Sequence, residues 1–261
     1  MLSAFFNSFL SERIKLRRSL LGWLIFCGGS FVPAIMLAVR IRRQQQLSGW
    51  HRLGIFWEKH WVESWESISI MILPLMVVLL TTLILQVEFR NNTWKQVHAS
   101  PQTWGAIFSA KLAVVLLAVL QLFVVINLGL YLAGALPSLL FAAEGVSSSP
   151  IPWRRLLARD ANYFIECLPI VAIQFMLALR YRNFLVPVGL GVAGWILSLV
   201  LINTNYNFLI PYNYTGIDYL ISTGHRSAQN LPAALGLLAC GTFAVLTLVS
   251  FVLYSRQADK G

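Results

Sequence analysis

Residues 112–136 read LAVVLLAVLQLFVVINLGLYLAGAL and contain no charged side chain. A helix crosses the hydrocarbon core of a bilayer with about 20 consecutive apolar residues, and this run exceeds that length. Of the 261 residues, 57% are hydrophobic and only 11% are charged, whereas a soluble domain has roughly a quarter of its residues charged. The composition therefore predicts an all-α membrane protein with several spans.

Six apolar segments are expected to cross the membrane. They are 19–39, 67–86, 106–136, 163–179, 184–202 and 231–254. We interpret 1–261 as a single transmembrane domain, in which 19–254 form a six-helix bundle and 255–261 a tail. An even number of spans puts both termini on one side of the membrane. Lys and Arg are slightly more numerous on that side, which the positive-inside rule predicts to be cytoplasmic.

Two amphipathic segments are predicted to lie in the membrane interface. In residues 1–18, apolar side chains recur at steps of three and four, which is typical of an interfacial helix. In the long loop after the first span, Trp57, Trp61 and Trp65 share one helical face, and we expect their indoles at the outer headgroups. A ligand-binding aromatic surface is the alternative. Between the last two spans, 203–230 predicts a short re-entrant or interfacial helix with tyrosines near the outer interface.

Catalytic and cofactor motifs are missing from the sequence. It has no G-x-x-x-x-G-K-[ST] loop for phosphate and no HExxH zinc motif. The histidines have no second ligand at metal spacing, and we expect them to be solvated loop side chains; they are His51, His60, His98 and His225. The net charge of +10 is attributed to loops that face anionic headgroups rather than to nucleic acid. We therefore assign no catalytic residue, no metal site and no cofactor to this chain.

Small and polar residues inside the spans predict helix packing. GLGVAG at 189–194 fits the pattern G-x-G-x-x-G, but it lies in an apolar span and so indicates close helix approach rather than dinucleotide binding. Gln121, Asn127 and Gln174 are expected to form interhelical hydrogen bonds, and they are also candidates for lining a pathway. No acid or base is expected at the centre of a span, since Glu166 is placed near an outer end. A carrier driven by protons or sodium usually buries such groups, so the energy should come from elsewhere.

The connection between the second and third spans is unusually polar. Residues 88–111 read EFRNNTWKQVHASPQTWGAIFSAK. Asn91 or Asn92 can cap a short helix of about two turns over 93–99. Ser100 and Pro101 suit the cap and first position of the next helix. The sequence therefore predicts a helix, a polar mini-helix, a sharp turn and another helix. A capped hairpin that only fixes orientation is the alternative.

This arrangement resembles type-2 ABC transporter permeases, at Glu88, Thr93, Pro101 and Lys111. In that family the polar mini-helix is the coupling helix, which contacts the ATP-binding subunit. The resemblance implies this role for Asn92, Thr93, Trp94, Lys95, Val97, His98 and Pro101, and position and charge suggest an ion pair between Glu88 and Lys111. One departure is Asn92, where a Gly commonly precedes the Thr. The N-terminal SERIKLRRSLLGWLI also resembles the lantibiotic-immunity and bacitracin-type branch.

The resemblance implies the permease subunit of a transporter in a bacterial plasma membrane. Its cargo would be a peptide, lipid or other amphipathic molecule. ATP and Mg would be bound by a separate ATP-binding-cassette subunit, and a second permease, either identical or a paralogue, would complete the pathway among membrane lipids. Two alternatives remain: a non-transporting membrane sensor or anchor of a complex, and a membrane-embedded enzyme that acts on lipid.

Overall fold

The computed structural model describes residues 6, 8–11, 20–43, 49–51, 53–90, 103–141, 150–204, 206–224 and 235–258, without the side chains of 88–90, 257 and 258. Within these ranges every regular element is helical and no strand occurs, which confirms the all-α prediction. The elements are α2 (Leu21–Arg42), α4 (Phe56–Ser67), the π-helical turn η1 (Ile68–Ile72), α5 (Leu73–Arg90), α7 (Trp104–Phe141), α8 (Trp153–Arg180), α9 (Leu185–Leu201), the 3₁₀ turns η3 (Asn207–Leu209) and η4 (Pro211–Asn213), α10 (Tyr214–Ser222) and α11 (Leu235–Ala258).

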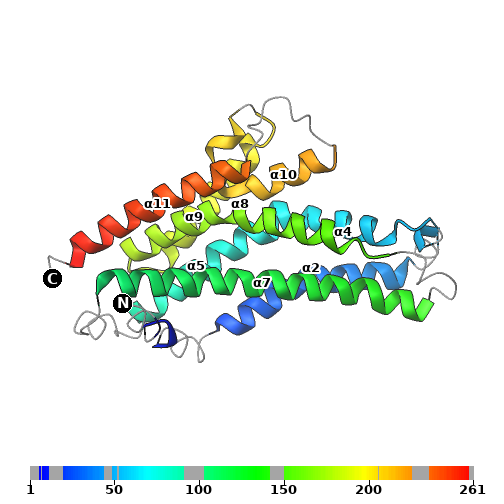
Figure 1. The fold of residues 1–261 in the computed structure, drawn as a ribbon, viewed down its shortest axis with the longest axis horizontal. Coiled ribbons are helices and arrows are strands. Elements are labelled where there is room, and N and C mark those ends of the chain that lie inside the picture. Colours follow the sequence, from blue (N-terminus) through cyan, green and yellow to red (C-terminus); the bar gives the residue numbers. More distant parts are fainter. Residues whose placement is uncertain are drawn as a thin grey trace.

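The long helices run side by side along the longest axis of the molecule (Figure 1). We name the two ends of this bundle after an arginine in each. At the Arg180 end, α5, α8 and α11 finish and α7 begins; at the Arg40 end, α2 finishes and α4 and α8 begin. The buried core is formed chiefly by α5, α7 and α8, whereas α2, α9 and α11 expose many large apolar side chains.

In the part of the chain that the structure describes, five helices are long and apolar enough to cross a membrane. They are Leu21–Arg42, Phe56–Val87, Trp104–Phe141, Trp153–Arg180 and Leu235–Arg256. The sixth predicted span corresponds to α9, an apolar helix of 17 residues. At 1.5 Å per residue α9 is about 26 Å long, a little short of the roughly 30 Å hydrocarbon core. The chain is therefore a multi-pass membrane protein, and its described residues contain five candidate spans and one shorter apolar helix.

The tryptophan segment is buried, which corrects the prediction of an interfacial helix. Trp57, Trp61 and Trp65 do share one face of α4, but that face packs inward. Trp65 stacks on Tyr163 of α8 with ring centroids 4.6 Å apart, and Trp57 stacks on Tyr131 of α7 at 5.7 Å. These aromatic partners, distant in sequence, provide an apolar surface that the periodicity of α4 alone does not reveal.

A π-helical turn joins α4 to α5, so that 56–90 form one helical rod with a widened turn at η1. Such a turn frees backbone carbonyls from the regular ladder. Two of them accept side-chain hydrogen bonds from other elements: Trp195 Nε1 of α9 donates to Ile70 O at 2.9 Å, and Thr215 Oγ1 of α10 donates to Ser69 O at 2.6 Å. The turn is therefore where α9 and α10 attach to the rod.

The remaining connections contain more helix than the sequence indicated. Residues 153–162, which precede the predicted fourth span, form the first turns of α8, and Leu156 is buried there. The predicted short helix within 203–230 is present as α10. Of the tyrosines in and before α10, Tyr212, Tyr214 and Tyr219 are buried against other helices and Tyr206 is exposed, and their position near the outer interface stays a prediction. Of the predicted interfacial helix 1–18, residues 8–11 are helical, and most of the rest lies outside the described residues.

Candidate functional site

The predicted coupling segment connects α5 and α7 at the Arg180 end. Its residues Asn92, Thr93, Trp94, Lys95, Val97, His98 and Pro101 lie outside the described residues, as does the side chain of Glu88. Lys111 is described. It lies near the beginning of α7 and is only 3% exposed, so it is buried instead of reaching toward the surface. A buried ammonium group is stable only when it is paired or hydrogen-bonded.

Gln86 links the end of α5 to the end of α8. Its Nε2 donates to Ala178 O at 3.2 Å and to Tyr181 O at 2.6 Å. The last carbonyls of a helix have no partner within that helix, and the Gln86 amide satisfies two such groups where α8 finishes. The helix that leads into the coupling segment is therefore fastened to α8 at the same end of the bundle.

The three candidate pathway residues lie in different surroundings. Gln174 is buried between helices, where its Nε2 donates to Tyr212 Oη at 2.9 Å and its Oε1 accepts from Thr82 Oγ1 at 3.4 Å. Asn127 is half-buried and its Nδ2 donates within its own helix to Phe123 O at 2.9 Å. Gln121 is exposed on α7. The interhelical bond predicted for Gln174 is present, and a pathway-lining role stays a prediction for all three.

Close helix approach at the GLGVAG segment is confirmed for two of its three glycines. A Cβ at Gly191 would meet the Gln174 amide and, at 2.6 Å, Val78 Cγ1; one at Gly194 would meet the Tyr212 ring at 2.8 Å. A Cβ at Gly189 would meet no atom within 4 Å. The small residues thus allow α9 to pack on α5, α8 and η4.

Arg40 is the centre of a buried polar cluster that the sequence did not predict. Arg40 is 2% exposed; its Nη2 donates to Glu63 Oε2 at 2.7 Å and its Nε to His60 Nδ1 at 3.2 Å. The guanidinium also lies 4.8 Å from the centre of the Trp50 ring. His60 Nε2 lies 2.9 Å from Leu130 O. Because Nδ1 accepts from Arg40, His60 is assigned as the neutral tautomer that donates from Nε2.

His51 and His60 are therefore not solvated, which corrects the sequence interpretation of both. His51 stacks on Phe56 with ring centroids 4.2 Å apart, and its Nε2 lies 2.8 Å from Ser138 Oγ. Burial lowers the pKa of His51 below its ordinary value. The neighbouring aromatic residues enclose both rings, a signal that was visible in the sequence as Trp50, Phe56 and Trp57.

A second buried ionisable group lies in the middle of α8. Glu166 was placed near the outer end of a span that began at 163, but α8 begins at Trp153. The Glu166 side chain is 2% exposed, and its Oε2 has no hydrogen-bond partner among the described residues. It interacts electrostatically with Asp218 of α10. Burial raises the pKa of Asp218, and Arg159 opposes that shift. Glu166 therefore lies in the middle of the candidate span Trp153–Arg180, which corrects the expectation that no acid occurs at the centre of a span.

The arrangement described so far is that of a membrane helix bundle with a polar connection at one end. A family model described as ABC-2 family transporter protein matches residues 8–198, well over half of the chain. The chain belongs to the ABC-2 transporter family. No curated protein and no solved structure matches it.

The matched region of this ABC-2 permease runs from the N-terminal segment through most of α9 and includes the connection between α5 and α7. Membership confirms the resemblance to type-2 ABC permeases. An ABC-2 permease is a membrane subunit that is not itself catalytic, and the family implies partnership with an ATP-binding-cassette subunit.

Proposed function

We propose that this ABC-2 permease exports or extracts an amphipathic peptide or lipid, with energy from ATP hydrolysed by Mg-dependent sites in its partner. The partner would bind the 92–101 segment. The observation that carries this proposal is the position of that segment: it joins two long helices, α5 and α7, within the region that the family model matches. A force applied there enters both helices at once.

The hydrogen bonds of Gln86 and η1 suggest how such a force would spread. Gln86 fastens α5 to α8 beside the segment. At its other end, α5 continues through η1 into α4. Trp195 of α9 and Thr215 of α10 donate hydrogen bonds to backbone carbonyls of η1. Closure of the partner on ATP would then move a connected set of helices rather than one loop, because rigid helices with discrete contacts transmit displacements.

Glu88 and Lys111 are proposed to form an ion pair across α5 and α7. The burial of Lys111 supports this, because an unpaired buried cation is strongly destabilising. Glu88→Lys and Lys111→Glu should each abolish transport, and the double variant with exchanged charges should recover it. A double variant as inactive as the single ones would rule out the pair.

The exposed apolar faces of α9 and α11 suit lipid or a second permease, identical or a paralogue. Six helices enclose little space, so we propose that two permeases form the pathway, in a bacterial plasma membrane with both termini cytoplasmic. The N-terminal sequence similarity favours the lantibiotic-immunity and bacitracin-type branch, whose cargo would be an amphipathic peptide.

The proposed function is tested by co-purification of the permease with its ATP-binding subunit. Trp94→Asp and Val97→Asp should each abolish co-purification, because a carboxylate cannot be accommodated in an apolar contact without a large desolvation cost. Trp153→Asp is the matched control, since Trp153 is exposed at the opposite end of the bundle and its replacement should leave the complex intact.

Two results would change the proposal. Assembly that survives both Trp94→Asp and Val97→Asp would show that the ATP-binding subunit contacts another surface. An assembled complex whose ATPase activity does not respond to amphipathic peptides or lipids would favour a non-transporting sensor or anchor.

A further inference from the structure

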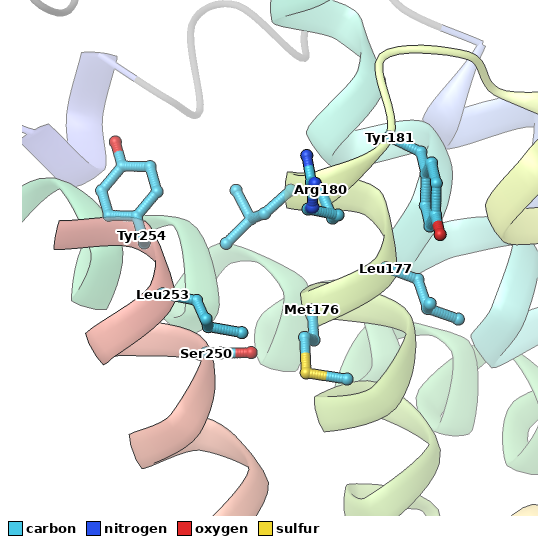
Figure 2. Close-up of a pocket in the computed structure, with 8 residues that line it drawn as sticks. Met176, Leu177, Arg180, Tyr181, Ser250, Leu253 and Tyr254 are labelled. Atoms are coloured by element: carbon cyan, nitrogen blue, oxygen red, sulfur yellow. The ribbon is translucent and has the colours of Figure 1, made fainter. Parts of the chain in front are cut away.

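A pocket opens between α8 and α11 at the Arg180 end (Figure 2). It has a volume of about 240 Å³ and is lined mainly by apolar side chains, including Met176, Leu177 and Leu253. Sites that enclose a whole small molecule have volumes of roughly 300–1,000 Å³. This pocket therefore fits one part of a larger amphipathic molecule better than a complete small ligand.

Ser250 is an unusual member of the lining. It is 2% exposed, and its Oγ has no hydrogen-bond partner among the described residues. Helical serines commonly donate to the carbonyl four residues earlier, as Ser64 does to His60 O and Ser138 to Gly134 O, both at 2.7 Å. Ser250 makes no such bond. A buried hydroxyl without a partner costs free energy, so the pocket has an unmet demand for a polar ligand atom.

Arg180 lies at the mouth of the same pocket. It is exposed and makes no hydrogen bond or ion pair with any residue that the structure describes. Figure 2 shows Arg180 about one helical turn beyond Met176, with Ser250 level with Met176 on the facing helix. One turn corresponds to about 5.4 Å along the helix axis. The pocket thus has a cation at its mouth, a hydroxyl donor one turn deeper and apolar walls.

We propose that this pocket binds an anionic glycerophospholipid. The order of groups along such a lipid matches the order of groups in the pocket: the headgroup phosphate would contact Arg180, an ester carbonyl would accept from Ser250 Oγ, and the first part of an acyl chain would lie against Met176 and Leu253. Guanidinium groups bind phosphate through charge-assisted hydrogen bonds. The ester carbonyl would satisfy the hydroxyl that the protein leaves unpaired.

Other occupants match fewer of these groups. A hydrocarbon chain alone leaves both Ser250 and Arg180 unsatisfied, and a free anion leaves the apolar walls empty. A zwitterionic lipid has the same esters, but its cationic headgroup opposes Arg180. The lipid would bridge the ends of α8 and α11, beside the helix end to which Gln86 fastens α5. This inference does not depend on the proposed coupling to an ATP-binding subunit.

The test uses the full-length permease, purified in mild detergent, stripped of lipid and titrated with phosphatidylglycerol or phosphatidylcholine of identical acyl chains. Native mass spectrometry measures the bound fraction. We expect phosphatidylglycerol to bind at least tenfold more tightly. Arg180→Gln should weaken its binding about tenfold, as loss of a charge-assisted hydrogen bond does. Arg154→Gln, which removes an exposed arginine from the other end of α8, should leave binding unchanged.

Two further variants test the interior of the pocket. Leu253→Trp should fill it and abolish binding of both lipids, whereas Leu248→Trp, at an exposed position of α11 outside the lining, should not. Ser250→Ala removes only an oxygen, so folding should persist while phosphatidylglycerol binds roughly fivefold more weakly. Equal losses in Arg180→Gln and Arg154→Gln, or unchanged binding in both Leu253→Trp and Ser250→Ala, would overturn the proposal.

Discussion

The two ends of the bundle surround an arginine in opposite ways. Arg40 is buried and contacts a carboxylate, an imidazole and an indole. Arg180 is exposed and has no polar partner in the part of the chain that the structure describes. The Arg40 end also has the stacked aromatic rings of α4, whereas the Arg180 end has a pocket. On our proposals, the Arg40 end serves internal stability and the Arg180 end binds other molecules.

Replacing the two arginines gives the largest expected contrast. Arg40→Ala removes the packing of a buried side chain and its hydrogen bonds to His60 and Glu63, which should lower the free energy of unfolding by about 2–4 kcal/mol. Arg180→Ala should change it by less than about 0.5 kcal/mol, as is usual for exposed side chains. Denaturant titrations in detergent measure both. Equal losses would remove the distinction between the ends.

Glycines of α9 extend the comparison to the middle of the bundle. Gly191→Ala places a Cβ against Val78 and the buried Gln174 amide, and we expect a loss of about 1–3 kcal/mol from overpacking. Gly189→Ala adds a Cβ in open space. Because Ala has a higher helix propensity than Gly, this variant should raise the free energy of unfolding by up to about 1 kcal/mol. The same titrations separate the two variants. Stabilisation by Gly191→Ala would show that α9 packs loosely.

Gln86 forms a buried contact between helices at the Arg180 end. Gln86→Ala should cost about 1–2 kcal/mol, since it leaves carbonyls at the end of α8 without donors. Gln121→Ala, on the exposed face of α7, should be close to neutral. Hydrogen exchange at 175–181 should increase in Gln86→Ala alone. Unchanged exchange there would mean that α5 does not restrain α8.

The smallest expected effect is a pH dependence at the Arg40 end. Since burial lowers the pKa of His51 in the folded state, the unfolded state binds protons more readily, and stability falls as the pH drops below about 6.5. Thermal midpoints at pH 7.5 and 5.5 should differ less in His51→Gln than in the wild type, by an amount equivalent to roughly 1 kcal/mol or less. An identical pH response in both proteins would contradict the assignment.

Hydrophobic runs made much of the fold predictable. Long apolar segments without central charges predict α2, α7 and α11. The resemblance of the polar connection at 88–111 to type-2 ABC permeases predicts the family. Periodicity also put Trp57, Trp61 and Trp65 on one face. It could not tell whether that face turns toward lipid headgroups or toward α7 and α8, because the partners Tyr131 and Tyr163 are far away in sequence.

Buried ionisable side chains were the part that the sequence could not indicate. Arg40 directly follows the first predicted span, 19–39, and nothing in local spacing connects it with residues 20 and 23 positions later. The sequence predicts that the fourth span begins at 163, which puts Glu166 near its end, whereas α8 begins ten residues earlier at Trp153. The pocket depends on the packing of α8 against α11, which no pattern within either helix determines. These features arise from tertiary contacts between segments that are each unremarkable by themselves.

The π-helical turn η1 has a consequence for how the 56–90 rod is oriented. Each residue of a regular α-helix advances the side-chain direction by about 100°, and a π turn accommodates one additional residue. The turn therefore sets the angular phase between the indoles of α4 and the apolar face of α5, so that both point into the bundle. Without the turn, a regular α-helix of the same length would rotate one of these faces by about 100° relative to the other and expose part of it. Deletion of one residue within 68–72 should therefore convert the π turn to regular α-helix and keep both faces pointing into the bundle.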